Sequence, residues 1–453
     1  MRDALLLAFF AVALPVMIWR PTWGALSWVW FGVFNPHRYA WGFAATAPFA
    51  TGIFVATLIG ALFSKEPKRL KGGAAAAVLL TFLTYTVFTT FFALVPDRAW
   101  DGLWTALKIQ LGTLLVLTLI YRKDHVIALV WVIAASIGFY AIKGGIFTLV
   151  TLGQNRVYGP DGTYIADNNA FALATVISIP LWAYLYTQYR ERRWFKWGIV
   201  AAIVLSTASA VGSHSRGAVV AIVAVAAFLW LKSRMKIVLG VLLVVAAIGA
   251  VAFMPESWEE RMRTITDPQS EKSADSRLET WKMLLNVAND RPLTGGGFNL
   301  YAPWVYEKYS GNTDQAYAAH SIYFQVLGEH GWIAFSLYLL FWALVWRMCS
   351  QVARMSRDRP DRHWAYWLAQ MLKVSLVAFL VGGAFLNLAY WDVPYYLFVA
   401  IAVTRTLLRS AEAASAEANN GELSGPGAEP ESPLVPVNSA PLAAQASGKA
   451  ERT

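Results

Sequence analysis

The sequence predicts an all-α integral membrane protein with about 12 transmembrane helices and one large loop outside the membrane. Of its 453 residues, 57% are hydrophobic and only 15% are charged, a composition too apolar for an ordinary soluble domain. Many apolar runs approach the ~20 residues that a helix needs to cross the hydrocarbon core. These runs are too long and too continuous for barrel strands, so a helical bundle is expected.

Apolar runs mark the expected helices in order along the chain. Examples are residues 43–63, 74–95, 126–142, 198–211, 237–254, 332–346 and 374–389. Two N-terminal runs, 4–18 and 22–34, are each short for a full crossing, which leaves the number of spans at about 12 or 13. Arg20, Pro21 and the second run follow the first without a small-residue cleavage site, so a removed signal peptide is not expected.

Basic residues are concentrated in short loops between the apolar runs. These loops are residues 64–73, 121–125, 188–197, 232–236 and 347–364. Because Lys and Arg are enriched in cytoplasmic loops, we place these loops inside. The long polar segment 256–319, in which acids outnumber bases, is placed outside. The net charge of +10 therefore indicates orientation and contact with membrane lipids, and no binding of nucleic acid is expected.

The sequence divides into a transmembrane catalytic domain, residues 1–410, and a tail, residues 411–453. The tail is rich in Ala, Ser, Glu, Pro and Gly, which predicts a disordered cytoplasmic segment. Segment 256–319 is expected to contain helices at 257–262 and 275–287, followed by a glycine turn. A single large polar loop on a buried protein is the natural place for a site that meets a substrate outside the bilayer.

A short outer turn, Ser213 to Gly217, places Arg216 at the outer membrane interface. One interpretation is an arginine that extends its guanidinium to the interface. The other is a fixed guanidinium that presents paired donors to a phosphate or carboxylate, with serines and Gly217 beside it to let the anion approach the backbone. The residues alone favour neither interpretation.

Two further arginines lie on the same outer side. Arg277 begins the second loop helix, where it either pairs with Asp275 or Glu279 or binds an anion. Arg156 lies in the loop before Asp167, which is first interpreted as a helix cap and only second as a substrate contact.

Three histidines compete for the role of a general base. His320 is the best candidate, because it stands where the outer loop re-enters the membrane and imidazole titrates near neutral pH. A lone histidine at a helix start is more often a cap or a packed residue. His330 lies deeper in the same segment beside Glu329, and His214 shares its turn with Arg216.

Lys108 and Lys143 lie near the outer ends of apolar segments. A buried ammonium is costly, so both are candidates to bind a substrate, although each is close enough to extend to the interface. The single cysteine, Cys349, gives no disulfide framework. The sequence has neither a His/Cys/Asp cluster at metal-ligand spacing nor a phosphate-binding Gly-Lys-Ser/Thr loop, so no metal and no cofactor are expected.

Four motifs resemble those of the O-antigen ligase (WaaL-type) and Wzy-like membrane glycosyltransferase superfamily. They are Ser213-His214-Ser215-Arg216-Gly217-Ala218, Ser276-Arg277-Leu278-Glu279-Thr280-Trp281, Pro292-Leu293-Thr294-Gly295-Gly296-Gly297, and His320-Ser321-Ile322-Tyr323 running to Gly328-Glu329-His330-Gly331. They occur in the family's order over roughly 205–345. The N-terminal half, with Asn35-Pro36-His37-Arg38 and Tyr140-Ala141-Ile142-Lys143-Gly144-Gly145, resembles exosortase-associated O-glycosylation ligases.

The resemblance implies a GT-C-type helical fold in the bacterial inner membrane, with a periplasmic active site and a cytoplasmic C-terminus. The donor would be a glycan on undecaprenyl pyrophosphate and the acceptor the lipid A–core oligosaccharide. The family's catalytic histidine matches His320, and its phosphate-binding arginines match Arg216 and Arg277. Ser321 stands where the family often has Asn. The implied reaction is metal-independent inverting glycosyl transfer, with Arg156 and Lys143 as further donor contacts.

Other activities fit the same residues. A polysaccharide polymerase would use the same donor with a second lipid-linked glycan as acceptor, and a protein O-oligosaccharyltransferase would use a protein hydroxyl. A lipid-glycan transporter would need polar residues near mid-membrane and repeat-related broken helices. The notable charges gather toward one face here, which favours an enzyme.

Overall fold

The computed structural model describes residues 2–40, 42–263, 272–311 and 317–423. Over these residues the regular elements are helices, without a strand, which confirms the all-α class. The α-helices are α1 (Arg2–Trp19), α2 (Pro21–Phe34), α3 (Phe49–Phe63), α4 (Ala74–Thr90), α5 (Pro96–Leu119), α6 (Lys123–Val150), α7 (Asn168–Tyr189), α8 (Arg193–Gly212), α9 (Arg216–Lys232), α10 (Lys236–Phe253), α11 (Glu256–Arg263), α12 (Lys272–Asp290), α13 (Pro303–Ser310), α14 (Ile322–Ser356), α15 (His363–Gly382) and α16 (Asp392–Leu423).

Length and composition identify the helices that can cross a membrane. Seven helical stretches in the described part of the chain qualify: Pro96–Leu119, Lys123–Val150, Asn168–Tyr189, Arg193–Gly212, Lys236–Phe253, Ile322–Ser356 and Pro360–Phe385. Three shorter apolar helices accompany them, at Leu6–Trp19, Phe49–Phe63 and Ala74–Thr90. A helical membrane protein is therefore confirmed, whereas about 12 spans and a GT-C-type arrangement remain predictions.

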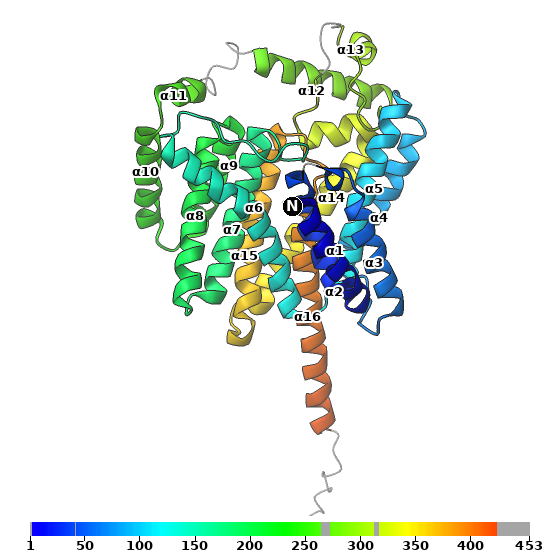
Figure 1. The fold of residues 1–453 in the computed structure, drawn as a ribbon, viewed down its shortest axis with the longest axis vertical. Coiled ribbons are helices and arrows are strands. Elements are labelled where there is room, and N and C mark those ends of the chain that lie inside the picture. Colours follow the sequence, from blue (N-terminus) through cyan, green and yellow to red (C-terminus); the bar gives the residue numbers. More distant parts are fainter. Residues whose placement is uncertain (1, 41, 264–271, 312–316, 424–453) are drawn as a thin grey trace, which may run out of the picture. The chain divides into compact units, whose positions relative to one another are not determined.

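The chain forms two compact units, Met1–Arg409 and Ser410–Thr453. In the first unit, α7 packs against α6, α8, α9 and α15 (Figure 1). Its fully buried side chains include Phe171 and Tyr184. Gly145 of α6 approaches the backbone of α8 so closely that a Cβ would collide with the carbonyl of Leu205. Small residues allow such backbone contact between helices in lipid.

The tail expected from residue 411 begins as a helix. α16 continues to Leu423, so residues 411–423 are helical, and the remainder of the predicted tail lies outside the described residues.

The long polar loop contributes α11, α12 and α13, and α12 packs against α13 and α14 (Figure 1). Its glycine turn is hydrogen-bonded to α14. Gly296 donates to the Gly328 carbonyl at 2.8 Å and Gly297 to the Glu329 carbonyl at 2.7 Å. Gly331 interrupts α14 with φ +76°, a conformation that a residue with a Cβ adopts only under strain. The turn and the interruption together fix the outer loop onto the start of α14.

α10 differs from its neighbours. It has no buried residue and packs against α9. Its side chains are compatible with lipid all round, which is the composition expected of a helix at the margin of a bundle.

Candidate active site

The turn between α8 and α9 holds three buried residues, Ser213, His214 and Ser215. Ser215 caps α9, because its hydroxyl accepts from the Ala218 N–H at 3.2 Å, and this makes Arg216 the first residue of the helix. His214 has a left-handed backbone, φ +55°, and its Nε2 lies 2.8 Å from the Gly153 carbonyl oxygen. The turn thus holds Arg216 in a defined position.

The start of α7 lies against this turn. Asn168 donates its Nδ2–H to the Ser213 carbonyl at 2.8 Å. Asp167 caps the same helix through Oδ1, which accepts from the Asn169 and Ala170 N–H groups at 2.8 and 3.1 Å. The predicted cap is therefore present.

His320 lies in the segment between α13 and α14, immediately before the N-cap residue Ser321. Its backbone is left-handed, φ +44°, and its side chain is partly buried. Trp281 of α12 donates its indole N–H to the Ala319 carbonyl at 2.7 Å and stacks on Phe324 with ring centroids 5.0 Å apart. These contacts attach α12 to the backbone that carries His320.

Arg277 and Asp167 are the charged groups that act on His320. Arg277 precedes Trp281 by four residues, so the two project from the same face of α12. Burial lowers the pKa of His320 from 6.5, Arg277 lowers it further, and Asp167 opposes them. A lowered pKa keeps the imidazole neutral at physiological pH, which a base requires. The fold thus brings together His320, Arg277 and the start of α7, which in turn contacts the Arg216 turn.

Arg156 and Lys143 line one cavity of about 530 Å³, which we call the cationic cavity. Arg38 lines it as well and donates to the Gly162 carbonyl at 2.9 Å. The opposing charge among its lining residues is Asp161. Sequence reasoning did not include Arg38 among the site residues, although Asn35-Pro36-His37-Arg38 was a visible motif.

The cationic cavity adjoins the Arg216 turn. Val157, next to Arg156, donates its N–H to the Gly212 carbonyl at 3.2 Å. Burial lowers the pKa of His214, and the nearby Arg156 and Arg261 add to this effect while Gly153 opposes it. Arg261 of α11 also donates to the His214 carbonyl at 2.9 Å. The long loop, the turn and the cavity therefore form one continuous polar region.

Comparison with known families divides the chain into two parts. Residues 201–339 match the O-antigen ligase family, and residues 1–190 match a family of unknown function. Residues 201–339 are therefore similar to O-antigen ligases. Residues 201–339, which we call the ligase segment, contain Arg216, Arg277 and His320. The residues that line the cationic cavity all lie within residues 1–190. A search of curated proteins found no match.

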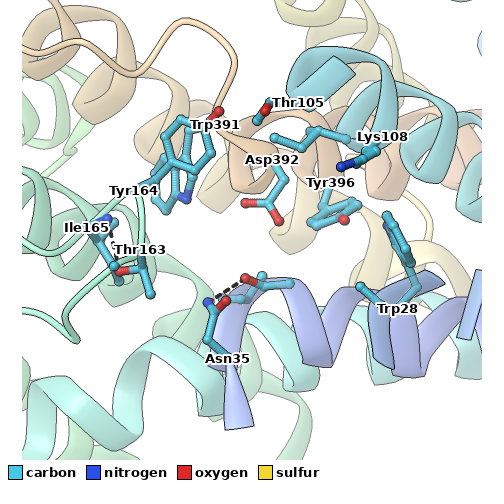
Figure 2. A pocket seen from close by; sticks show the side chains of 15 residues that line it. Trp28, Asn35, Thr105, Lys108, Thr163, Tyr164, Ile165, Trp391, Asp392 and Tyr396 are labelled. Carbon is cyan, nitrogen blue, oxygen red and sulfur yellow. Dashed lines mark hydrogen bonds between the residues drawn. The ribbon is translucent and has the colours of Figure 1, made fainter. Parts of the chain in front are cut away.

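Lys108 lies outside the ligase segment, in a second cavity of about 300 Å³ that we call the aromatic cavity. Figure 2 shows Lys108 and Asp392 among the side chains that line this cavity, together with Trp28, Tyr164, Trp391 and Tyr396. Asp392 is 7% exposed, and its carboxylate points into the cavity (Figure 2). Asp392 was not predicted as a site residue, because an acidic residue in the first turn of a helix is common.

One loop separates the two cavities. Residues 157–161 line the cationic cavity and residues 162–165 line the aromatic cavity. Lys143 and Lys108, which the sequence treated as equivalent, therefore belong to different cavities.

His330 of the ligase segment lies in packed protein and lines neither cavity. Its Nδ1 is 2.7 Å from the Thr89 hydroxyl, and its ring packs edge-on to Phe298 at 4.3 Å. The adjacent Glu329 is also buried and accepts hydrogen bonds from the Tyr390 hydroxyl at 2.8 Å and the Asn299 N–H at 3.2 Å. These contacts support a packing role for His330.

Proposed function

We propose that the chain is an O-antigen ligase, which transfers a glycan from undecaprenyl pyrophosphate to a hydroxyl of the lipid A–core oligosaccharide. The match of residues 201–339 to the O-antigen ligase family supports an enzyme that joins a lipid-linked glycan to a lipid acceptor. The observation that carries the proposal is that Arg277 and Asp167 both act electrostatically on His320, while Asn168, next to Asp167, donates to the Ser213 carbonyl in the turn before Arg216.

In this reaction His320 takes the proton from the acceptor hydroxyl. The hydroxyl oxygen forms a bond to the anomeric carbon of the donor while the bond from that carbon to the pyrophosphate oxygen breaks. The electron pair leaves with undecaprenyl pyrophosphate, and the proton stays on the imidazole until it passes to solvent. A single displacement inverts the anomeric centre.

Charge develops on the departing pyrophosphate, and Arg216 and Arg277 stabilise it. Fixed donors aimed at developing charge are usually the largest electrostatic term in catalysis, and removing one typically costs about 2.7–4 kcal/mol in barrier. Guanidinium groups present paired donors to phosphate oxygens, so this role needs no metal ion.

The cationic cavity supports a second part of the proposal. Arg156 and Lys143, together with Arg38, give positive charge next to the turn that carries Arg216. A diphosphate held partly there would lie next to the Arg216 turn. The Lys143 ammonium lies over the ring of Phe139, 5.4 Å from the ring centroid, and this cation–π contact helps to hold it at the cavity.

The aromatic cavity supports binding of a sugar ring near the donor site. Aromatic faces pack on the C–H surface of a sugar, and the Asp392 carboxylate and the Lys108 ammonium can bond its hydroxyls. We assign this cavity to the glycan part of the donor or acceptor.

Reconstitution with defined substrates tests the proposal. Purified protein in detergent should join a lipid-linked glycan to purified lipid A–core; mass spectrometry should detect the product, and NMR should show the inverted anomeric configuration. His320→Ala should abolish product while donor binding persists. If the lipid-linked units are joined only to each other, the chain is a polymerase, and if only to protein hydroxyls, a protein O-oligosaccharyltransferase. If no glycan is transferred but lipid-linked glycan crosses vesicle membranes, the chain is a transporter.

A further inference from the structure

A cavity of about 350 Å³ lies between the start of α4, α14 and α16, apart from both cavities of the candidate site. Arg347, Arg405 and Arg409 contribute side chains to it, and its described lining contains no acidic residue. By the distribution of basic loops, this cavity belongs to the cytoplasmic side. We call it the triple-arginine cavity.

The three guanidinium groups lie close enough to interact. Arg347 and Arg409 are the charges that act on Arg405. The Nε of Arg405 is buried and has no hydrogen-bond partner in the described part of the protein. Like charges that are partly removed from water repel one another and leave donors unsatisfied, so an anion between them would stabilise the arrangement.

Two further features of the cavity suit an anion that also carries a hydroxyl. α4 begins here after Gly73, and although the Ala75 N–H already donates to the Gly72 carbonyl at 3.2 Å, the positive end of the helix dipole faces the cavity. Gln351 of α14 also lines the cavity, and its Oε1 is buried without a donor among the described residues. The cavity thus offers donors for a phosphate and one acceptor for a hydroxyl.

We propose that the triple-arginine cavity binds the head group of an anionic phospholipid from the cytoplasmic leaflet. The phosphate lies between the arginines and the start of α4, and a head-group hydroxyl donates to Gln351. The acyl chains follow α14, on which Leu344 lines the cavity and Leu340, one turn away on the same face, is 46% exposed. Phosphatidylglycerol, which carries both a phosphate and hydroxyls, is the probe of choice.

Native mass spectrometry of the delipidated full-length protein measures this binding directly. Phosphatidylglycerol should bind with a defined stoichiometry and more tightly than phosphatidylethanolamine of the same chains. The double variant Arg347→Gln/Arg405→Gln should lower the affinity for phosphatidylglycerol by about tenfold or more, because each basic residue near a head group adds measurably to its binding. Gln351→Leu should lower the affinity for phosphatidylglycerol. It should leave the affinity for phosphatidic acid unchanged, because that lipid lacks the head-group hydroxyls.

The matched control is Arg354→Gln/Arg357→Gln, which removes two exposed arginines from the same side without touching the cavity. Equal losses in the control and in the cavity variant would mean general attraction to anionic lipid and would overturn the site. Displacement of the lipid by millimolar inorganic phosphate would overturn the assignment to a lipid. A monodisperse, thermally stable Arg405→Lys variant with partly retained binding would support it and exclude misfolding as the cause.

Discussion

At the residue scale, His320 is influenced by a positive charge, Arg277, and a negative charge, Asp167. Its backbone is left-handed, a conformation that few residues other than glycine adopt. The left-handed φ of +44° and the partial burial are held by neighbouring contacts and not by the histidine itself. Residues in such conformations cluster at functional sites, where the surrounding structure must compensate for the strain. His214 shares this conformation, with φ +55°, but its Nε2 already has a carbonyl partner.

The pH dependence of the reaction tests the base. Arg277→Gln removes a positive charge that disfavours the imidazolium, so the pKa of His320 rises and the acid limb of kcat/KM moves to higher pH. Asp167→Asn removes a charge that favours the imidazolium but keeps the cap, so the limb moves to lower pH. Initial rates from about pH 4 to 9 measure both shifts, relative to the ordinary histidine pKa near 6.5.

Arg122→Gln, an exposed change on a different loop, is the control for these profiles. If the acid limb stays in place in both site variants, another group is the base.

The carboxylate of the aromatic cavity allows an isosteric test of sugar binding. Asp392→Asn should raise KM for the glycan substrate by about tenfold, with a smaller change in kcat, because a charge-assisted hydrogen bond to a hydroxyl contributes about 1.5 kcal/mol or more. Steady-state kinetics with a defined donor measure this split. Asp101→Asn, an exposed change on α5, should leave both constants unaltered.

At the element scale, hydropathy predicted the helices well but not their interruptions. The apolar run 332–346 lies within α14. Nothing in the spacing of its apolar residues predicts that Gly331, directly before the run, has a left-handed backbone. The loop helices 257–262 and 275–287 are found within α11 and α12. Local patterns predict local structure, whereas an interruption in α14 depends on the glycine turn that packs on it from another part of the chain.

The Gly331 interruption should be sensitive to a single methyl group. In Gly331→Ala the Cβ would collide with the Pro292 carbonyl, and φ +76° would be strained, so we expect destabilisation by about 2 kcal/mol or more. Thermal unfolding in detergent should show a lower Tm. Gly249→Ala, in α10 with nothing within 4 Å of the new Cβ, is the matched control and should not lower the Tm.

At the scale of the whole molecule, the motifs predicted three candidate site residues but not all the residues of the cavities. Arg216, Arg277 and His320 could be proposed because each stands in a recognisable local sequence. Arg38 and Asp392 could not, because each becomes informative only when distant segments meet around a cavity. The number of spans likewise depends on short N-terminal helices, whose length alone does not decide a crossing.

Orientation in the membrane can be tested with single cysteines. Cys349 is fully buried, so its thiol should give little background with a maleimide. In intact cells a membrane-impermeant maleimide should label Ser257→Cys in α11 but not Ala413→Cys, and permeabilised cells should label both. The reverse pattern would invert the predicted topology.

The proposed chemistry places all phosphate stabilisation on arginines and lysines. Chelation with excess EDTA should therefore leave the initial rate of the reconstituted reaction unchanged. A loss of rate that Mg²⁺ or Mn²⁺ restores would contradict the metal-independent mechanism.

The unburied surface of α10 has an evolutionary consequence. Most side chains along it lie on the surface of the protein, where lipid accepts any aliphatic shape, so exchanges among Val, Leu and Ile carry little penalty there. α7 is surrounded by other helices, and the same exchanges would change the volume of a close-packed interior. Homologues should therefore differ freely along one helix while the other keeps its side chains nearly fixed.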